Sequence, residues 1–202
     1  MSHKGDSTSC KDAIKKWASE SKEDPSQAKK VLLICLIPSI KKMDNSLNSL
    51  ISCEHLGLST NCIDRIGALP NLKKLKILSL GRNNIRRFEK LDDLKDTLEQ
   101  LWISYNSIDK LDGLKNLKQL KVLFMSNNHI KNFDELLKLQ ECDLLEELLL
   151  LGNPIYEDLD VTSRRAEVIR RLPKLKKLDN VLISELERDA AIKGDDLNTE
   201  TE

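Results

Sequence analysis

The chain has few of the residues that build aromatic cores, catalytic centres or metal sites. Aromatic residues make up 3% of the 202 positions, and the three histidines, His3, His55 and His129, are scattered. The sequence has no glycine-rich phosphate loop, no nucleophile elbow and no recognisable Cys/His pairing. We therefore expect no catalytic activity and no cofactor, and the volume of a core has to come from Leu and Ile.

Neither sign of charge is in excess, since 33 Lys and Arg balance 33 Asp and Glu. A balanced charge gives no general reason to expect a nucleic acid or an anionic membrane as partner. The apolar run at 31–37 ends at Pro38 and is too short to cross a bilayer. Nothing near residue 1 resembles a targeting peptide. We therefore expect a soluble protein of the cytoplasm.

The cysteines do not indicate disulfides or a metal site. Their number is odd, no CxxC pair occurs, and no His lies at ligand spacing from them. The sequence therefore predicts reduced thiols and no bound metal. The five positions are Cys10, Cys35, Cys53, Cys62 and Cys142.

One short pattern, L-x-x-L-x-L-x-x-N-x-L, recurs along the middle of the chain at a period of 22 to 25 residues. A fixed period of this length is typical of leucine-rich repeats, whose coils stack into a solenoid. Cys53 replaces the first Leu in the first of the matching segments. The segments are CEHLGLSTNCI (53–63), LKILSLGRNNI (75–85), LEQLWISYNSI (98–108), LKVLFMSNNHI (120–130) and LEELLLLGNPI (145–155).

Within each segment the apolar residues alternate with period two, which predicts a short strand with one buried face. The predicted inward pairs are Leu78 and Leu80, Leu101 and Ile103, Leu123 and Met125, and Leu148 and Leu150. The Asn of each segment turns the chain off the sheet, and its side-chain amide can satisfy backbone groups that would otherwise be buried unpaired. We assign this structural role to Asn61, Asn83, Asn106, Asn128 and Asn153.

We therefore predict an α/β fold, a leucine-rich-repeat solenoid with a parallel sheet of short strands and helical caps at both ends. Residues 1–52 form the N-terminal cap, with one helix opening at Ser9 and a second from Asp24-Pro25 to about Leu33, before a degenerate first coil. The repeats span 53–160, and 161–183 form a C-terminal helical cap. Residues 184–202 are acidic, and we expect a flexible tail there, helical at most in its first turns.

Apolar residues also occupy strand positions that the alternation points outward. Trp102, Phe124 and Leu149 fall at equivalent positions of three successive coils, so they should lie side by side, and Ile77, Val122 and Leu151 widen this patch. Tyr105 and Arg82 lie in the turns at its rim. We interpret the patch as a protein-binding site, centred on a Trp anchor. The alternatives are that a terminal helix of the chain covers it, or that these residues are isolated apolar exceptions.

A second candidate site is basic. Arg164, Arg165, Arg170 and Arg171 follow closely on the predicted C-terminal helix, with Glu167 as the one acid among them. The cluster is either a solvated helix face or a docking site for an acidic protein surface.

The motifs LWISYN and MSNN, with the closing LPKLKKLD, resemble the axonemal dynein light chain 1 family of outer dynein arms. The resemblance runs from about Ile14 to Asp179. It implies a non-catalytic monomer of the ciliary or flagellar axoneme that binds a dynein heavy chain through the repeat sheet. The contact implied is with the microtubule-binding domain on the stalk, where such light chains regulate how the motor engages the microtubule. The basic arginines would suit a nearby tubulin surface.

Two other functions fit a short leucine-rich-repeat protein. One is a regulatory subunit that holds a phosphatase on its sheet face, and the other is a splicing-type protein that presents a nucleic-acid-binding partner. Neither of these classes has the LWISYN and MSNN motifs, and the phosphatase regulators carry more repeats.

Overall fold

The computed structural model describes the backbone of residues 7–199 and the side chains as far as Lys193. Its centre is one eight-stranded sheet in which the strand order follows the chain. The first seven strands are parallel, and the last pairs antiparallel with the seventh. The strands are β1 (Lys30–Leu32), β2 (His55–Gly57), β3 (Ile77–Ser79), β4 (Gln100–Trp102), β5 (Val122–Phe124), β6 (Glu147–Leu149), β7 (Lys177–Leu178) and β8 (Val181–Leu182).

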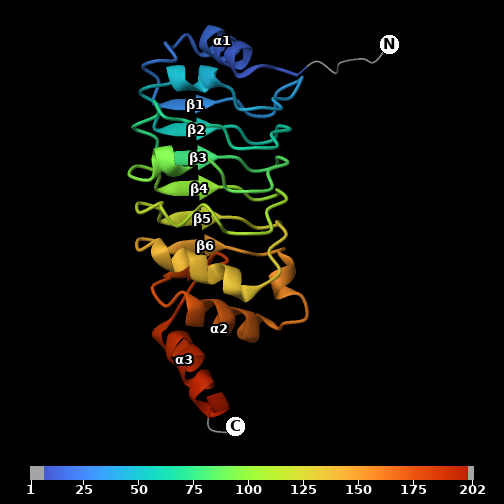
Figure 1. Ribbon diagram of the computed structural model, residues 1–202, viewed down its shortest axis with the longest axis vertical. Coiled ribbons are helices and arrows are strands. Elements are labelled where there is room, and N and C mark those ends of the chain that lie inside the picture. The colour runs from blue at the N-terminus through green and yellow to red at the C-terminus, as the bar shows by residue number, and fades with distance from the viewer. Residues whose placement is uncertain (1–6, 200–202) are drawn as a thin grey trace, which may run out of the picture.

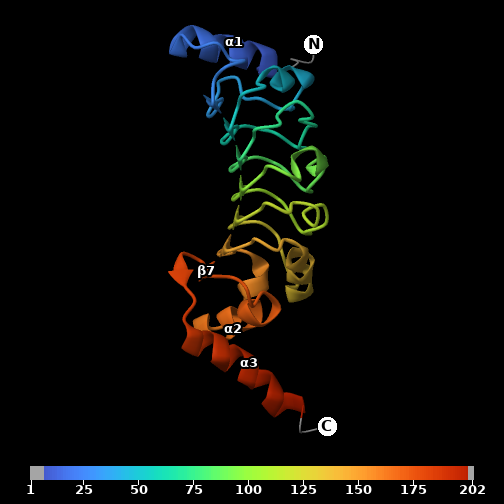
Figure 2. The ribbon, with the colours of Figure 1, turned by 90° about the vertical axis from the view of Figure 1, so that its left-hand side faces the viewer.

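Successive coils stack along one axis, with the strands on one side and the return segments on the other (Figures 1 and 2). The predicted leucine-rich-repeat solenoid is confirmed. Several returns contain short 3₁₀ helices, which are η1 (Asn45–Ser49), η2 (Asp92–Leu94), η3 (Phe133–Glu141) and η4 (Pro154–Tyr156). The ends carry three α-helices, which are α1 (Cys10–Ser21), α2 (Val161–Arg171) and α3 (Glu185–Thr199).

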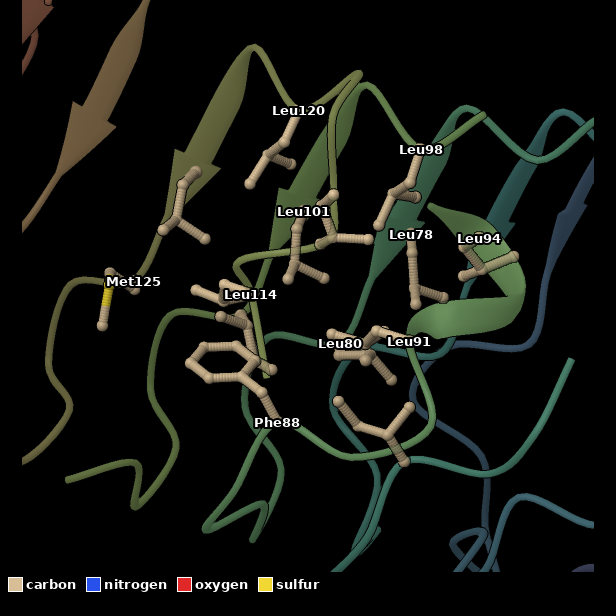
Figure 3. Close-up of a cluster of buried hydrophobic side chains, with 14 of the residues drawn as sticks. Leu78, Leu80, Phe88, Leu91, Leu94, Leu98, Leu101, Leu114, Leu120 and Met125 are labelled. Carbon is tan, nitrogen blue, oxygen red and sulfur yellow. The ribbon is translucent and has the colours of Figure 1, made fainter. Parts of the chain in front are cut away.

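The core lies between the sheet and the returns and consists mainly of Leu and Ile. All the predicted inward pairs are fully buried, and so are the return residues Leu94 and Leu117. Figure 3 shows part of this core, with Leu78, Leu80 and Leu94 among the labelled residues. Burying one such side chain contributes roughly 1.5–3 kcal/mol. Each coil supplies only one layer of this core, so the layers are buried by stacking rather than within a coil.

The ladder asparagines join each coil to the preceding one. Asn83 Oδ1 accepts a hydrogen bond from the backbone N–H of Ile63 at 2.9 Å. Its Nδ2 donates to the carbonyls of Leu58 at 3.0 Å and Leu80 at 2.9 Å. Asn61, Asn106, Asn128 and Asn153 make the corresponding bonds, and all five side chains are buried. The structural role predicted for these residues follows directly from this geometry.

The N-terminal cap was only partly predicted. Helix α1 begins as expected, with Ser9 accepting from the N–H of Asp12, but the second helix predicted from Asp24 to Leu33 is wrong. Asp24 caps a single turn, and β1 follows and pairs with β2. Pairing buries Val31 and Leu33 against the next coil, which outweighs the local helix signal. The first coil, which we predicted within 1–52, therefore includes β1 and joins the sheet.

The C-terminal region departs from prediction after α2, which forms as expected. A β7–β8 hairpin follows, and α3 occupies most of the segment predicted to be a flexible tail. Helix α3 packs against α2 and buries Ala191, and this contact explains why an acidic segment is helical here. The rest of the predicted tail, 200–202, and the first six residues of the N-terminal cap lie outside the described residues.

The asparagine ladder leads to a stability prediction. Asn83→Ala should lower the free energy of unfolding by about 1–3 kcal/mol, because it leaves a buried N–H and two buried carbonyls without their partner. The neighbouring Asn84 is exposed, so Asn84→Ala should change the free energy by no more than about 0.5 kcal/mol. Urea unfolding followed by circular dichroism measures both. Equal effects of the two substitutions would contradict the proposed role of the ladder.

Candidate protein-binding site

Trp102, Phe124 and Leu149 lie side by side on the outer face of the sheet, as predicted. The strand register pairs Trp102 with Phe124 and Phe124 with Leu149. The rings of Trp102 and Phe124 are stacked, with centroids 6.1 Å apart and planes inclined by 22°. All three side chains are half-buried. Together they form a continuous apolar row across β4, β5 and β6, which we call the central row.

The other predicted apolar residues extend this row unequally. Val122 lies on the same face of β5 as Phe124, and Leu151, which is 36% exposed, follows Leu149 at the end of β6. Ile77 belongs to the neighbouring row, but Gln100 separates it from Val122 in the register. The apolar patch is therefore concentrated on β4 to β6.

The rim residues Arg82 and Tyr105 contact each other in the turns that follow β3 and β4. The Arg82 guanidinium lies 4.4 Å from the centre of the Tyr105 ring, which is a cation–π distance. Both residues have a positive φ, at 56° and 59°, because each directly precedes a ladder asparagine. Tyr105 remains 47% exposed. The turn geometry thus holds an aromatic ring and a cation at the border of the patch.

The alternative of a terminal helix covering the patch does not describe this structure. Helix α1 packs on η1 at one end of the stack, and α3 packs on α2 at the other. Figure 2 shows the outer face of the strands open between these ends. The central row is therefore accessible to a partner over the described residues.

Sequence reasoning missed a second apolar group on the same face, at β1. Leu32 and Ile34 are 36% and 46% exposed, and Leu32 pairs with Gly57 in the register. Gly57 and Ser79 then separate Leu32 from Trp102 with small side chains. A Cβ on Gly57 would approach Leu32 Cδ2 to 2.6 Å, so a larger residue there would require the Leu32 side chain to move. The alternation Leu32-x-Ile34 was the signal for this group, but the segment was interpreted as a helix.

His55 borders Trp102 and was likewise not predicted as a site residue. Its ring meets the indole edge-on, with centroids 5.6 Å apart, and its Nε2 lies 3.2 Å from Ser79 Oγ. Burial, together with the nearby charge of Lys30, lowers the pKa of His55. The indole Nε1–H of Trp102 is covered and has no acceptor among the described residues. Trp102 therefore presents an apolar surface, next to an imidazole that favours its neutral form.

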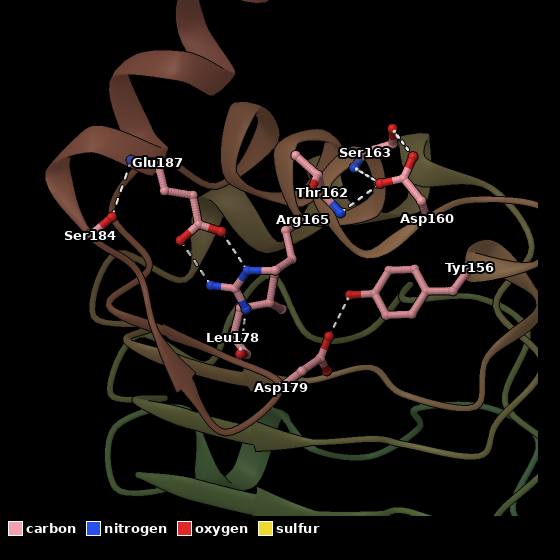
Figure 4. Close-up of polar contacts among 9 residues, drawn as sticks. All are labelled: Tyr156, Asp160, Thr162, Ser163, Arg165, Leu178, Asp179, Ser184 and Glu187. Carbon is pink, nitrogen blue, oxygen red and sulfur yellow. Dashed lines mark hydrogen bonds and ion pairs between the residues drawn. The ribbon is translucent and has the colours of Figure 1, made fainter.

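The basic cluster needs a correction at Arg165, which is buried rather than exposed. Its guanidinium donates to Glu187 Oε2 at 3.0 Å and to the Leu178 carbonyl at 2.9 Å, so it joins α2 to α3 and to β7 (Figure 4). The hydrogen bond from Arg165 lowers the pKa of Glu187. Sequence inspection missed Glu187 as the partner because it lies in the segment expected to be flexible. Arg165 is a structural residue.

The other three arginines of the cluster are partly exposed and also contact groups of the chain. Arg164 lies 5.1 Å from the centre of the Tyr156 ring. Arg170 and Arg171 both pair with Glu167. The cluster is thus partly neutralised from within, although parts of these side chains remain at the surface.

The described residues contain no group of three side chains suited to hold a metal ion. Burial raises the pKa of the thiols of Cys10, Cys53 and Cys142 to about 11, which makes them poor nucleophiles. Over the same residues, no helix has both the length and the apolar character required to traverse a bilayer.

Comparison with solved structures agrees with the fold. An internalin of Listeria monocytogenes has a TM-score of 0.55 and 26% identity, over 70% of this chain and 38% of its own. The Drosophila melanogaster SNF/U2A′ complex gives a TM-score of 0.54 at 22% identity, over 88% of this chain and 90% of that chain, which shows the fold alone. The family profile described as Leucine Rich repeats (2 copies) matches residues 96–138.

Stacked strands, the asparagine ladder and an open apolar sheet face define a leucine-rich-repeat protein. Dynein axonemal light chain 1 of Chlamydomonas reinhardtii is 52% identical over 188 residues, 91% of this chain and 95% of its own. The Homo sapiens protein of that name is 52% identical over 190 residues, 94% and 96% of the two chains. The Danio rerio protein is 54% identical over 173 residues, 85% and 90%. The chain belongs to the dynein axonemal light chain 1 family.

The environment of His55 leads to a pH prediction. Its NMR titration midpoint should lie below the ordinary value of about 6.5. Between the lowered pKa and about 6.5, the unfolded chain binds more protons, so stability should rise with pH across this window and fall as the pH drops through it. Lys30→Gln should raise the midpoint only part of the way back to the ordinary value, since burial is the larger cause of the lowered pKa. A midpoint at or above 6.5 would contradict this account.

The Arg165–Glu187 pair leads to a second prediction. Glu187→Gln should lower the free energy of unfolding at neutral pH by roughly 1–3 kcal/mol, because a buried guanidinium loses its charged partner. Glu185 on the same helix is exposed, and Glu185→Gln should cost no more than about 0.5 kcal/mol. Because the pKa of Glu187 is lowered, the difference from wild type should be full above about pH 4.3 and shrink below it. Thermal and denaturant unfolding across this pH range measures it.

Proposed function

We propose that the protein is a non-catalytic light chain of an axonemal outer-arm dynein. It binds the heavy chain at the microtubule-binding domain on the stalk and regulates how the motor engages the microtubule. The observation that carries the proposal is the open row of Trp102, Phe124 and Leu149 on a rigid sheet. Membership of the dynein axonemal light chain 1 family supports both the partner and the axoneme as the location.

The shape of the face favours a helical segment of the partner. The same register position continues from the central row onto β3, β2 and β1, where the small residues Ser79 and Gly57 separate Trp102 from Leu32. An amphipathic helix with apolar side chains on one face fits such a surface. Aromatic anchors of this kind concentrate binding energy, since their large area is held at low entropic cost.

Polar groups around the patch would set the orientation of the partner. Arg82 and Tyr105 form one border, and Gln100 and Glu147 lie in the row next to Trp102 and Leu149. A partner that matches these groups is selected over other helices, because an unmatched polar group is costly once it is buried. The site residues we assign to the heavy chain are Trp102, Phe124, Leu149, Ile77, Val122, Leu151, Tyr105 and Arg82.

A microtubule contact would involve a different surface. Arg164, Arg170 and Arg171 are partly exposed at the end of the stack, where α2 lies. We assign to them a secondary electrostatic contact with tubulin, which Glu167 weakens by neutralising part of their charge.

The binding site can be tested with the double substitution Trp102→Ala and Phe124→Ala. It removes the stacked pair at the centre of the patch, so affinity for the heavy-chain microtubule-binding domain should fall roughly 100-fold or more. Isothermal titration calorimetry with the isolated stalk tip measures the affinity, and circular dichroism confirms that the coils remain folded.

A control removes two exposed Leu side chains away from the outer face of the strands, with Leu137→Ala and Leu144→Ala. Their affinity should stay within about threefold of wild type, since they lie away from the proposed contact. Retained binding by the folded Trp102/Phe124 variant would refute the proposed site.

A further inference from the structure

The two long edges of the solenoid carry different charge patterns. On the edge where the chain enters each strand, the residue just before the strand alternates in sign over seven coils. Neighbouring members pair, as in Lys76–Glu54 at 3.2 Å and Lys121–Glu99 at 2.8 Å. The alternating positions are Lys29, Glu54, Lys76, Glu99, Lys121, Glu146 and Lys176. On this edge, the charge of each coil is thus balanced by the opposite charge of its neighbour.

The edge where the chain leaves the strands does not follow this rule. Successive coils are hydrogen-bonded there, through Cys62 N–H to Ile40 O at 2.9 Å and Asn84 N–H to Ile63 O at 2.8 Å. Four successive coils have a buried Ile at this position, namely Ile40, Ile63, Ile85 and Ile108. In each coil the residue two positions after the Ile is a cation. These residues, which we call the basic stripe, are Lys42, Arg65, Arg87 and Lys110.

The basic stripe is exposed and unpaired. All four side chains are exposed, and none of them forms an ion pair or a side-chain hydrogen bond within the part of the chain that the structure describes. Like charges on neighbouring strands oppose stacking, and coils lie only about 4.8 Å apart at the sheet. On the opposite edge the signs of charge alternate from coil to coil, so four like charges in succession are not a general property of these repeats.

A groove accompanies the stripe between the turns that follow the first and second repeat segments. Its volume is about 510 Å³, and Asp64, Arg65, Asn84, Arg86, Arg87 and Glu89 line it. Arg86 is exposed and also lacks an ion pair among the described residues, so the side chains of three arginines line the groove. Their planar donor forks match carboxylates in a bidentate arrangement.

We infer that the basic stripe is a binding surface for an acidic, extended segment of a partner polypeptide, which runs across the coils and places carboxylates on Arg65 and Arg87. The acids on this edge favour a polypeptide over a denser polyanion. Asp64 and Glu89 lie in the groove and Asp109 follows one coil later. They would repel a continuous array of phosphates, whereas a peptide can place its own uncharged or basic residues opposite them.

This surface is separate from the patch of Trp102 and Phe124. The central row lies on the outer face of the strands, while the stripe follows the turns beyond their C-terminal ends. The inference does not rest on heavy-chain binding, so the stripe and the patch are tested by different variants and either can fail alone.

The probe is a fluorescein-labelled peptide of about ten glutamates, long enough to exceed the roughly 14 Å spanned by four coils. Fluorescence anisotropy with the full chain should show saturable binding at about 50 mM salt that weakens at about 150 mM. Arg65→Glu with Arg87→Glu should weaken it about tenfold or more, because two charge-assisted contacts become repulsive.

The control variant reverses the same number of charges on the return side of the same coils, with Lys73→Glu and Lys95→Glu, both exposed. It should retain affinity within about threefold. No binding by wild type, or an equal loss in the control, would overturn the inference. Single-stranded DNA and phosphatidylserine vesicles complete the test, and tighter binding of either one that the Arg65/Arg87 variant also loses would overturn the assignment to a polypeptide.

Discussion

Stability in this protein depends on backbone hydrogen bonds that each coil makes with its neighbours rather than with itself. The strands have two or three residues, so no strand pair is stable alone. The buried asparagine of each repeat completes the connection where the chain turns away from the sheet, since its amide serves the backbone of two coils at once. This constraint holds all coils in one register, and the surface pattern follows from that register.

Because the strands pair in one register, the residues that alternate along each strand form continuous rows on the two faces of the sheet. Because Leu101 and Leu123 point into the core, Trp102 and Phe124 must point out, and pairing places them next to each other. The site therefore needs no loop to fold over it and no local rearrangement to form. A preorganised apolar face of this kind loses little entropy on binding.

Charge is distributed by the same stacking. Cations and anions that lie far apart in the chain meet across neighbouring coils on one edge, while on the other edge four cations accumulate. At the C-terminal end, by contrast, the charged residue Arg165 is buried, and it holds α2 and α3 together through Glu187. The other three arginines of the cluster do not contact Glu187, so closeness in sequence did not indicate which arginine is buried.

The sequence by itself determined the repeat, the ladder of asparagines, the inward pairs and the order of Trp102, Phe124 and Leu149 on the sheet. These features follow from periodicity, and periodicity is visible without coordinates. Tertiary structure alone decided that 30–32 would be a strand, that Leu32 and Ile34 would join the apolar face, and that 185–199 would be a helix. Each of these depends on contacts with an adjacent layer, which outweigh local preference because burial and pairing contribute more free energy than propensity does.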